Sequence, residues 1–330
     1  MTGDQGSDMK QLADAVCASD RRALAQAITL IESTREDHRA QAEELLEHLL
    51  PKSGGSIRIG ISGVPGVGKS TFIESFGQDW VKAGHRVAVL AVDPSSQRGG
   101  GSILGDKTRM EDLSRAPEAF IRPSPTGGTL GGVARRTREV LLACEAASFD
   151  VVLVETVGVG QSETAVADLV DMFVLLLLPS GGDELQGIKR GIMELADLVV
   201  VNKADGDLVD AAERSAAEFT NALRLLHPTT GDWVPEVLTC SSLEGTGMSE
   251  VRQQAERFRD LATKAGYLGE RRAEQARRWM WGEVDEHLLA AFRRHPGVRE
   301  KVGELEQKVS EGAVTPSSAA QLLLDAFRQS

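Results

Sequence analysis

One segment, residues 63–71, most constrains how this chain can fold. It reads Gly-Val-Pro-Gly-Val-Gly-Lys-Ser-Thr, follows an apolar run at 57–62 and precedes a helical pattern that starts near Lys69. Glycine lets the backbone bend so that successive N–H groups face phosphate oxygens, and the start of the helix adds a favourable partial charge. This order predicts a phosphate-binding loop rather than a glycine-rich turn without a ligand. The predicted nucleotide contacts here are Gly63, Val64, Pro65, Gly66, Val67, Gly68, Lys69, Ser70 and Thr71.

Three side chains of this loop have predicted roles. We expect Lys69 to reach the β- and γ-phosphates and the Ser70 hydroxyl to bind Mg²⁺. Thr71 is the predicted contact to the α-phosphate.

Apolar runs typical of buried parallel strands alternate with helical patterns through the middle of the chain. This alternation predicts an α/β fold of the P-loop NTPase kind, with a mainly parallel sheet flanked by helices. The predicted strands are 57–62, 87–92, 151–155, 172–178, 198–202 and 237–240.

The sequence predicts three segments. Residues 1–54 are expected to be short amphipathic helices, because apolar residues such as Leu24, Ile28 and Ile31 recur at three- and four-residue spacing. Residues 55–247 form the predicted nucleotide-binding domain. Residues 248–330 carry long charged helical patterns and are predicted to be a helical extension.

Charge and cysteine usage exclude several classes of protein. The formal net charge of -12 disfavours binding to nucleic acid or to anionic lipid, so any anionic ligand must be held locally. The apolar stretches are too short to span a membrane, and the polar first ten residues lack a signal-peptide core. Cys17, Cys144 and Cys240 are isolated, which fits a reducing compartment. We therefore expect a cytoplasmic protein.

The segment 202–205, Asn-Lys-Ala-Asp, is the candidate for base recognition. The Asp205 carboxylate can accept from both N1–H and N2–H₂ of guanine, a donor pair that adenine does not offer. Lys203 would pack over the base and Asn202 would brace the loop. Alone, these four residues after a strand would better fit an Asn-Asp turn, but their order and spacing after the phosphate-binding loop favour the base site. A second guanine-contacting loop is expected after the last strand, at Ser241, Ser242 and Leu243.

Two carboxylates end predicted strands, Asp93 after 87–92 and Glu155 at the end of 151–155. Because ligands bind at the carboxyl ends of strands in this architecture, both are candidates to organise Mg²⁺, its waters or the attacking water. The alternative is that each is a helix N-cap or a solvated turn residue.

Three loops, 93–110, 124–138 and 179–189, are rich in glycine and polar residues. Loops this long inside an α/β domain are usually functional or disordered. Our hypothesis is that the first and the third reorganise when γ-phosphate and Mg²⁺ are present. The polar residues to test are Asp106, Arg109, Gln186 and Lys189, for which a surface role is the alternative.

Val159 follows Gly158 at the position where many small GTPases have the glutamine that orients water. We therefore predict slow intrinsic hydrolysis that accelerates when a partner or a second subunit completes the site, an effect of up to about 10⁵-fold.

These residues and motifs resemble those of the MeaB, MMAA and ArgK family of cobalamin-associated P-loop GTPases, and the resemblance covers nearly the whole chain. The motifs that carry the resemblance are 63–71, 93–96, 101–110, 155–163, 182–189 and 202–205.

The resemblance implies a dimeric GTPase chaperone that uses GTP and Mg²⁺. It would bind a cobalamin-dependent acyl-CoA mutase such as methylmalonyl-CoA mutase, gate cofactor delivery and protect or rescue the enzyme. The C-terminal helices would supply the dimer contact, although they could equally just cover the domain. The family's Mg²⁺-linked positions correspond to Ser70, Asp93, Asp106 and Glu155, and its third switch to 181–189. The candidate catalytic residues are Lys69, Asp93, Glu155, Gln186 and Lys189.

Other functions remain open at this point. A metallochaperone GTPase would carry a His-rich tail or closely spaced cysteines, whereas the six histidines here are scattered. A kinase or transport-linked ATPase, the label once attached to the ArgK group, is disfavoured by the guanine motif at 202–205. A scaffold without turnover would share the same motifs. Which acyl-CoA mutase is the client is not determined by the sequence.

Overall fold

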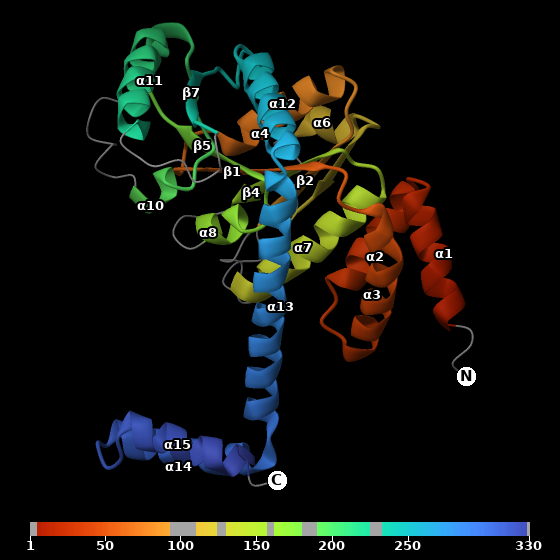
Figure 1. Cartoon of the computed structure of the whole chain (residues 1–330), viewed down its shortest axis with the longest axis vertical. Coiled ribbons are helices and arrows are strands. Elements are labelled where there is room, and N and C mark those ends of the chain that lie inside the picture. The colour runs from red at the N-terminus through yellow and green to blue at the C-terminus, as the bar shows by residue number, and fades with distance from the viewer. Residues whose placement is uncertain are drawn as a thin grey trace. The chain divides into compact units, whose positions relative to one another are not determined.

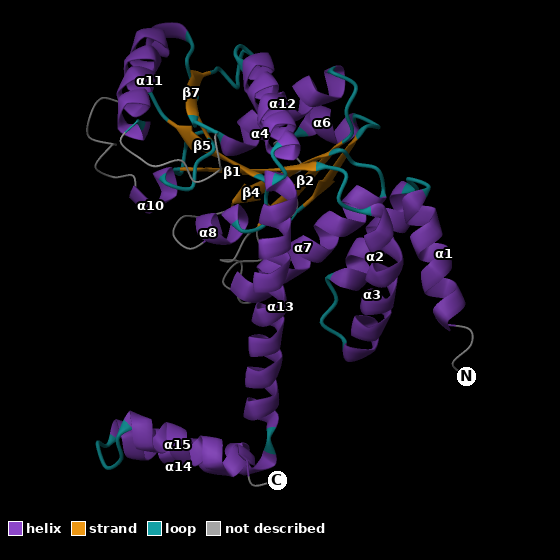
Figure 2. Ribbon diagram, in the orientation of Figure 1, coloured by secondary structure: helices purple, strands orange, loops and turns teal. Residues whose placement is uncertain are grey.

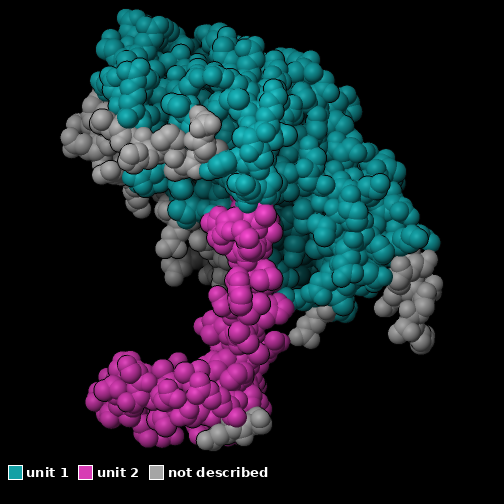
Figure 3. All heavy atoms as spheres, in the orientation of Figure 1, with its two compact units in different colours: residues 1–272 teal, residues 273–330 magenta. Residues whose placement is uncertain are grey.

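The computed structural model describes residues 5–92, 110–123, 130–156, 162–179, 190–224 and 233–328 (Figure 1). The chain divides into two compact units, Met1–Arg272 and Ala273–Ser330 (Figure 3). The first unit holds all the strands that the structure describes, so it contains the predicted nucleotide-binding loop and the base-recognition segment.

The first unit is built on one sheet (Figure 2). Its seven strands are parallel and lie in the order β3-β2-β4-β1-β5-β6-β7. The predicted parallel α/β sheet is therefore confirmed. Strands β2 to β4 lie on one side of β1, and β5 to β7 lie on the other. The loop after β1 therefore lies at the point where the strand order reverses direction. Ligands bind at this point in open parallel sheets. The strands are β1 (Ile57–Gly63), β2 (Val87–Val92), β3 (Ala119–Arg122), β4 (Val151–Thr156), β5 (Met172–Leu177), β6 (Leu198–Val201) and β7 (Glu236–Thr239).

The edge strand β3 was not among the predicted strands. It is four residues long and pairs with β2 at the end of the sheet. Its first two residues are buried, whereas Ile121 and Arg122 are only partly buried. An edge strand this short lacks the long apolar run by which the central parallel strands are predicted.

Helices cover both faces of the sheet. On one face α4 (Lys69–Lys82), α6 (Glu111–Arg115) and α12 (Met248–Lys264) share a core with alternate strand residues such as Ile57, Ile59 and Ile61. The intervening strand residues face the other helices: Gly60 lies against α8, and Val199 and Val201 pack against α10 and α11. The helices of this second face are α7 (Leu130–Ala146), α8 (Ser162–Ala167), α10 (Arg190–Met193) and α11 (Val209–Leu223), and a 3₁₀ turn, η2 (Gly206–Leu208), precedes α11.

The chain begins with the predicted helical segment. Its helices pack on one another and on α7. Leu24, Ile28 and Ile31, the apolar stripe from which a helix was predicted, are buried. Asp20 caps the second helix, because its carboxylate accepts from the backbone N–H groups of Arg22 and Ala23. These elements are α1 (Gln5–Cys17), α2 (Arg21–Ile31), α3 (Glu36–Leu49) and the 3₁₀ turn η1 (Leu50–Lys52).

The C-terminal region is helical, as predicted. Helix α12 packs on α4 within the first unit, and α13 (Tyr267–Arg294) crosses from the first unit into the second. In the second unit, the Phe327 ring makes edge-to-face contacts with Phe292 and His295, and α14 (Pro296–Ser310) packs against α15 (Pro316–Arg328). The compact units divide after residue 272, and the division of the chain into the segments 1–54, 55–247 and 248–330 stays a prediction. Among the helices described here, all are too short or too polar to cross a membrane.

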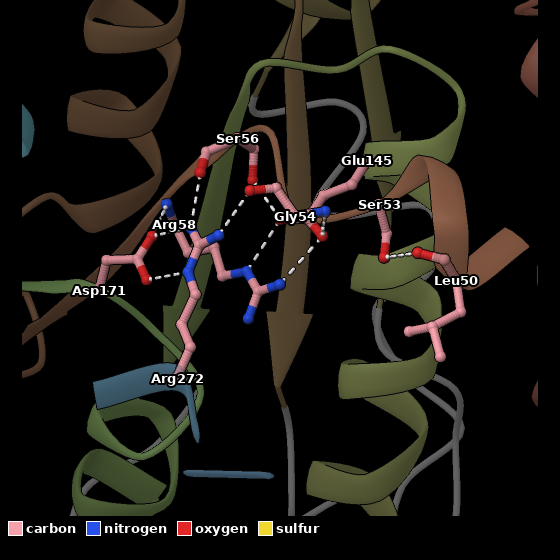
Figure 4. Close-up of polar contacts among 8 residues, drawn as sticks. All are labelled: Leu50, Ser53, Gly54, Ser56, Arg58, Glu145, Asp171 and Arg272. Atoms are coloured by element: carbon pink, nitrogen blue, oxygen red, sulfur yellow. Dashed lines mark hydrogen bonds and ion pairs between the residues drawn. The ribbon is translucent and has the colours of Figure 1, made fainter. Parts of the chain in front are cut away.

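A buried ionic network fixes the amino edge of the sheet, the edge opposite the phosphate-binding loop (Figure 4). The guanidinium group of Arg58 on β1 donates to both carboxylate oxygens of Glu145 on α7, each at 2.9 Å. Glu145 also accepts from the Ser56 hydroxyl at 2.6 Å and from the Gly54 N–H at 2.8 Å. Strand β1 is thus held at its start by α7 and by the segment that leads out of η1.

Candidate functional site

The phosphate-binding loop lies between β1 and α4, and its conformation depends on glycine. At Gly63, the last residue of β1, a Cβ atom would lie 2.6 Å from the Leu176 carbonyl oxygen of the adjacent strand. Gly68 precedes α4 with φ of +92°, a left-handed conformation that residues with a side chain rarely adopt. Val67 between them is buried in the core. The loop is therefore shaped by backbone packing as well as by its glycine content.

Lys69 is the first residue of α4, and its side chain turns back toward the start of the loop. Its Nζ donates to the Gly63 carbonyl oxygen at 2.9 Å. Burial lowers the pKa of Lys69 from its ordinary value, and the negative charges of Glu155 and Glu163 act in the opposite direction. A phosphate group beside Lys69 would stabilise the ammonium form further.

Ser70 lies beside Glu155, with the Ser70 hydroxyl 3.3 Å from Glu155 Oε1. Glu155 is on β4, next to β1 in the sheet, and is only 5% exposed. A hydroxyl and a carboxylate are oxygen ligands of the kind that Mg²⁺ prefers. Among the described residues, His, Cys, Asp and Glu form no group of three or more that could hold a metal by themselves. The pair therefore fits a Mg²⁺ ion that takes its remaining ligands from nucleotide phosphates and water.

The base-recognition segment follows β6 and is tied to the phosphate-binding loop. Asn202 Nδ2 donates to the Val67 carbonyl oxygen and Lys203 Nζ donates to the Gly66 carbonyl oxygen, both at 2.8 Å. Lys203 has φ of +62°, which for a residue with a long side chain is a strained conformation of the kind found at functional sites. The bonded residues are 135 positions apart for Asn202 and Val67 and 137 positions apart for Lys203 and Gly66. The two predicted motifs are thus in direct contact.

The loop after β7 meets the same segment. Ser242 donates to Asn202 Oδ1 from its backbone N–H at 3.1 Å and from its hydroxyl at 2.7 Å. The Ser241 hydroxyl donates to the Asp205 carboxylate. Cys240 Sγ lies 3.5 Å from Asn202 Oδ1, and burial raises the pKa of its thiol to about 12. These contacts hold Asp205 and Asn202 in a fixed relation to the loop that the sequence assigned to a second guanine contact.

The structure therefore gathers most of the predicted site residues at the carboxyl edge of the sheet. Lys69, Ser70 and Glu155 form one group, and the base-recognition residues form a second group joined to it through the phosphate-binding loop. Pro65, Thr71 and Leu243 are exposed, Leu243 at 82%. The other candidates lie outside the described residues, namely Asp93, Asp106, Arg109, Val159, Gln186 and Lys189.

Two residues of this region were not singled out from the sequence. Glu163, on α8, is buried and acts electrostatically on Lys69. Ser75, on α4, donates its hydroxyl to the Ser242 carbonyl oxygen at 2.5 Å. Ser75 is one serine in an ordinary helical stretch and its partner is 167 residues away, so no local pattern signals the contact.

A parallel sheet with a glycine-rich loop between its central strand and the next helix, joined to a separate base-recognition segment, defines the class of P-loop nucleoside triphosphatases. The particular family follows from comparison with known proteins. The family model described as "Methylmalonyl Co-A mutase-associated GTPase MeaB" matches residues 24–296, and the chain belongs to this family. It is a GTPase of the P-loop type.

Relatives of known sequence cover the chain almost completely. A protein described as "Putative GTPase" from Caulobacter vibrioides is 59% identical over 320 residues, 97% of this chain and 98% of the relative. The protein "Methylmalonic aciduria type A homolog, mitochondrial" of Mus musculus is 51% identical over 318 residues, 93% of this chain and 77% of the relative.

One solved structure agrees in fold over the full chain. A protein described as "LAO/AO transport system kinase" is 36% identical, has a TM-score of 0.79, and the match covers 98% of both chains. The match therefore includes the helices that precede the sheet in the sequence and those that follow it.

Proposed function

We propose that the chain is a Mg²⁺-dependent GTPase that acts as a chaperone of a cobalamin-dependent acyl-CoA mutase, in the first instance methylmalonyl-CoA mutase. Binding and hydrolysis of GTP would gate delivery and exchange of adenosylcobalamin and would protect or reactivate the mutase. The observation that carries this proposal is the match of residues 24–296 to a family described as mutase-associated. The name of the mouse relative, which refers to methylmalonic aciduria, supports the same client.

In the proposed cycle, backbone N–H groups of residues 63–71 and the ammonium group of Lys69 bind the phosphates. Ser70 and Glu155, together with Asp93 and Asp106, would hold Mg²⁺. When bound, Mg²⁺ neutralises charge that develops on the phosphate oxygens during hydrolysis. The contact between Ser70 and Glu155 supports this assignment. Gln186 and Lys189 are the proposed polar residues of the segment that responds to the γ-phosphate.

Guanine is the proposed base. The Asp205 carboxylate would accept from N1–H and N2–H₂, Lys203 would cover the base, and the 241–243 loop would complete the pocket. The bonds that join Asn202 to both the phosphate-binding loop and Ser242 support a base site whose parts are fixed to one another. A fixed geometry of this kind reduces the entropy lost on binding.

Hydrolysis by the isolated chain is proposed to be slow, because Val159 occupies the position of the water-orienting glutamine of many small GTPases. A mutase or a second subunit would complete the site. A homodimer through the C-terminal helices is part of the proposal, and the exposed apolar residues Trp281 and Leu288 on α13 support it. The proposed location is the cytoplasm, consistent with three free cysteines.

Purified protein and purified methylmalonyl-CoA mutase test the proposal directly. We expect a complex whose affinity differs between GDP and a non-hydrolysable GTP analogue, and single-turnover GTP hydrolysis that is faster with the mutase than without it. Lys69→Ala should remove nucleotide binding and with it the nucleotide dependence of the complex. A complex that forms equally in all nucleotide states, with no change in hydrolysis, would contradict the chaperone cycle.

The description of the structural relative as a transport system kinase makes phosphotransfer from ATP the second candidate function. Nucleotide preference separates the two. ATP binding as tight as GTP binding would favour the kinase and contradict the guanine assignment of Asp205.

A further inference from the structure

Helix α4 contacts the guanine loop as well as carrying the phosphate-binding loop at its start. Ser75, six residues after Lys69, is half-buried, and its hydroxyl donates to the Ser242 carbonyl oxygen at 2.5 Å. Hydroxyl groups within helices commonly bond to the carbonyl four residues earlier, as Thr29 and Thr220 do in this chain. Ser75 instead makes a bond to a residue 167 positions away.

The partner of Ser75 is itself the centre of a hydrogen-bond network. Ser242 is 4% exposed and donates two hydrogen bonds to Asn202 Oδ1, while Asn202 Nδ2 donates to the Val67 carbonyl oxygen. Val67 precedes α4 by two residues. The bonds therefore form a closed ring that runs from α4 through Ser75, Ser242 and Asn202 to the phosphate-binding loop and back into α4.

The same peptide segment positions the residue proposed to recognise guanine. Ser241, next to Ser242, is fully buried, donates its hydroxyl to the Asp205 carboxylate and donates its N–H to the Thr246 carbonyl oxygen at 3.0 Å. A shift of the main chain at Ser242 would move the adjacent Ser241, the hydroxyl partner of Asp205, with it. Because buried hydrogen-bond networks are costly to leave partly satisfied, the loss of one member is transmitted to the others.

We propose that Ser75 is a positioning residue for guanine recognition, which holds the main chain at Ser242 through its carbonyl oxygen so that Asp205 presents both carboxylate oxygens to the base. The inference rests on the proposed nucleotide site. It gives α4 two functions, since the helix binds phosphate at its start and orients the base loop from a residue six positions further on.

The ratio of the affinities for GTP and ITP tests whether Ser75 positions Asp205. Inosine lacks the 2-amino group, so GTP uses both oxygens of Asp205 and ITP only one. A single hydrogen bond of this kind is worth about 1 kcal/mol, so Ser75→Ala should weaken GTP binding about three- to tenfold. ITP binding should fall less, and the GTP-to-ITP affinity ratio should therefore decrease.

The experiment is competition of GTP and ITP against a fluorescent GDP on the full chain in Mg²⁺ buffer. Ser75→Thr keeps the hydroxyl and should retain a ratio within about twofold of the original. Thr220→Ala is the matched control, because it removes a half-buried helical hydroxyl that bonds only within its own helix at Ala216. Hydrogen exchange of the Ser242 amide gives a second readout without nucleotide, and Ser75→Ala should accelerate it whereas Thr220→Ala should not.

The outcomes separate this inference from the proposed function. An unchanged GTP-to-ITP ratio and unchanged Ser242 exchange in Ser75→Ala overturn the positioning role. An Asp205→Ala variant in the same assay tests the base site itself: if it leaves the ratio unchanged, the nucleotide site is wrong whatever Ser75 does. If Ser75→Ala does not fold, Ser75→Cys replaces the hydroxyl by a weaker donor of similar size and carries the same prediction.

Discussion

Arg272 and Asp171 form a two-point ion pair at the amino edge of the sheet. Arg272 Nε lies 2.7 Å from Asp171 Oδ1 and its Nη2 lies 2.6 Å from Oδ2 (Figure 4). Asp171 is fully buried directly before β5, and its Oδ2 also accepts from the Arg58 backbone N–H on β1. Arg272 donates further to the carbonyl oxygens of Gly54 and Ser56. The start of α13 is thus fixed to the central strands at the edge opposite the nucleotide site.

The first prediction concerns this pair. Arg272→Ala should lower the free energy of unfolding by about 3 kcal/mol, because removal of one member of a buried pair leaves the other charge with too few partners. Burial works against the charge of Arg272, but hydrogen bonds and attraction from Asp171 outweigh it and raise the pKa of the guanidinium group. Urea unfolding followed by circular dichroism measures the change.

Arg277→Ala is the control for that measurement. Arg277 pairs with Glu274 on the same helix, but both side chains are more than half exposed. Exposed pairs contribute about 0–1 kcal/mol, so this variant should be nearly as stable as the original chain. Equal stability of the two variants would show that the ion pair of Arg272 is not a significant anchor.

The second prediction concerns Mg²⁺. Glu155→Gln should raise the Mg²⁺ concentration needed for half-maximal GTP binding by about tenfold or more, as loss of a group that orients a metal site commonly does. Titration of Mg²⁺ into chelator-treated protein with a fluorescent GTP analogue gives the value. Glu43→Gln, an exposed change of equal charge on α3, should have no effect. A Mg²⁺ requirement that Glu155→Gln leaves unchanged would remove this carboxylate from the metal site.

The predictable part of the molecule is the part that local chemistry dictates. Residues 63–71 form a phosphate-binding loop because closely spaced glycines, a lysine and a hydroxyl supply that geometry in one stretch of chain. The central strands are equally visible, since a parallel strand buried on both faces is a continuous apolar run. This accounts for the success with β1, β2 and β4.

Contacts between distant residues were not predictable in the same way. Arg272 lies in a helix with several other arginines, and nothing in its spacing indicates that it, rather than Arg277 or Arg278, meets a buried aspartate. Ser75 and Ser242 likewise meet only because the fold brings α4 beside the loop that follows β7. The pattern gives each element, whereas tertiary packing decides which polar side chains become partners.

The third prediction follows from the burial of the cysteines. Burial raises the pKa of Cys144 and Cys240, the latter to about 12, and raises the pKa of the partly exposed Cys17 as well. A raised pKa means less thiolate at neutral pH, so reaction with iodoacetamide should be slower than for a free cysteine and should accelerate as pH rises.

Accessibility then decides which cysteine reacts. We expect one thiol per native chain to be labelled at pH 8, and Cys17→Ser should remove that labelling, because Cys144 and Cys240 are buried. Mass spectrometry of the intact protein counts the labels. Rapid labelling of Cys240 in the native chain would mean that the loop beside Asn202 opens far more often than its hydrogen bonds indicate.

The last prediction tests how Asp205 selects the base. Asp205→Asn replaces one carboxylate oxygen by an amide group that donates, so it no longer matches both donors of guanine but can donate to the C2 carbonyl of xanthine. Sites that lose such a match discriminate strongly, and GTP affinity should fall by about 100-fold or more while XTP binding becomes measurable. The amide oxygen can still accept from Ser241, so the loop should keep its structure.

Competition binding with GTP, XTP and ATP measures the change in base preference. Asp207→Asn, at an exposed position in η2, is the matched control. If Asp205→Asn retains GTP preference and gains no affinity for XTP, the base is recognised by other groups and the arrangement around Asn202 and Ser242 serves the phosphate-binding loop alone.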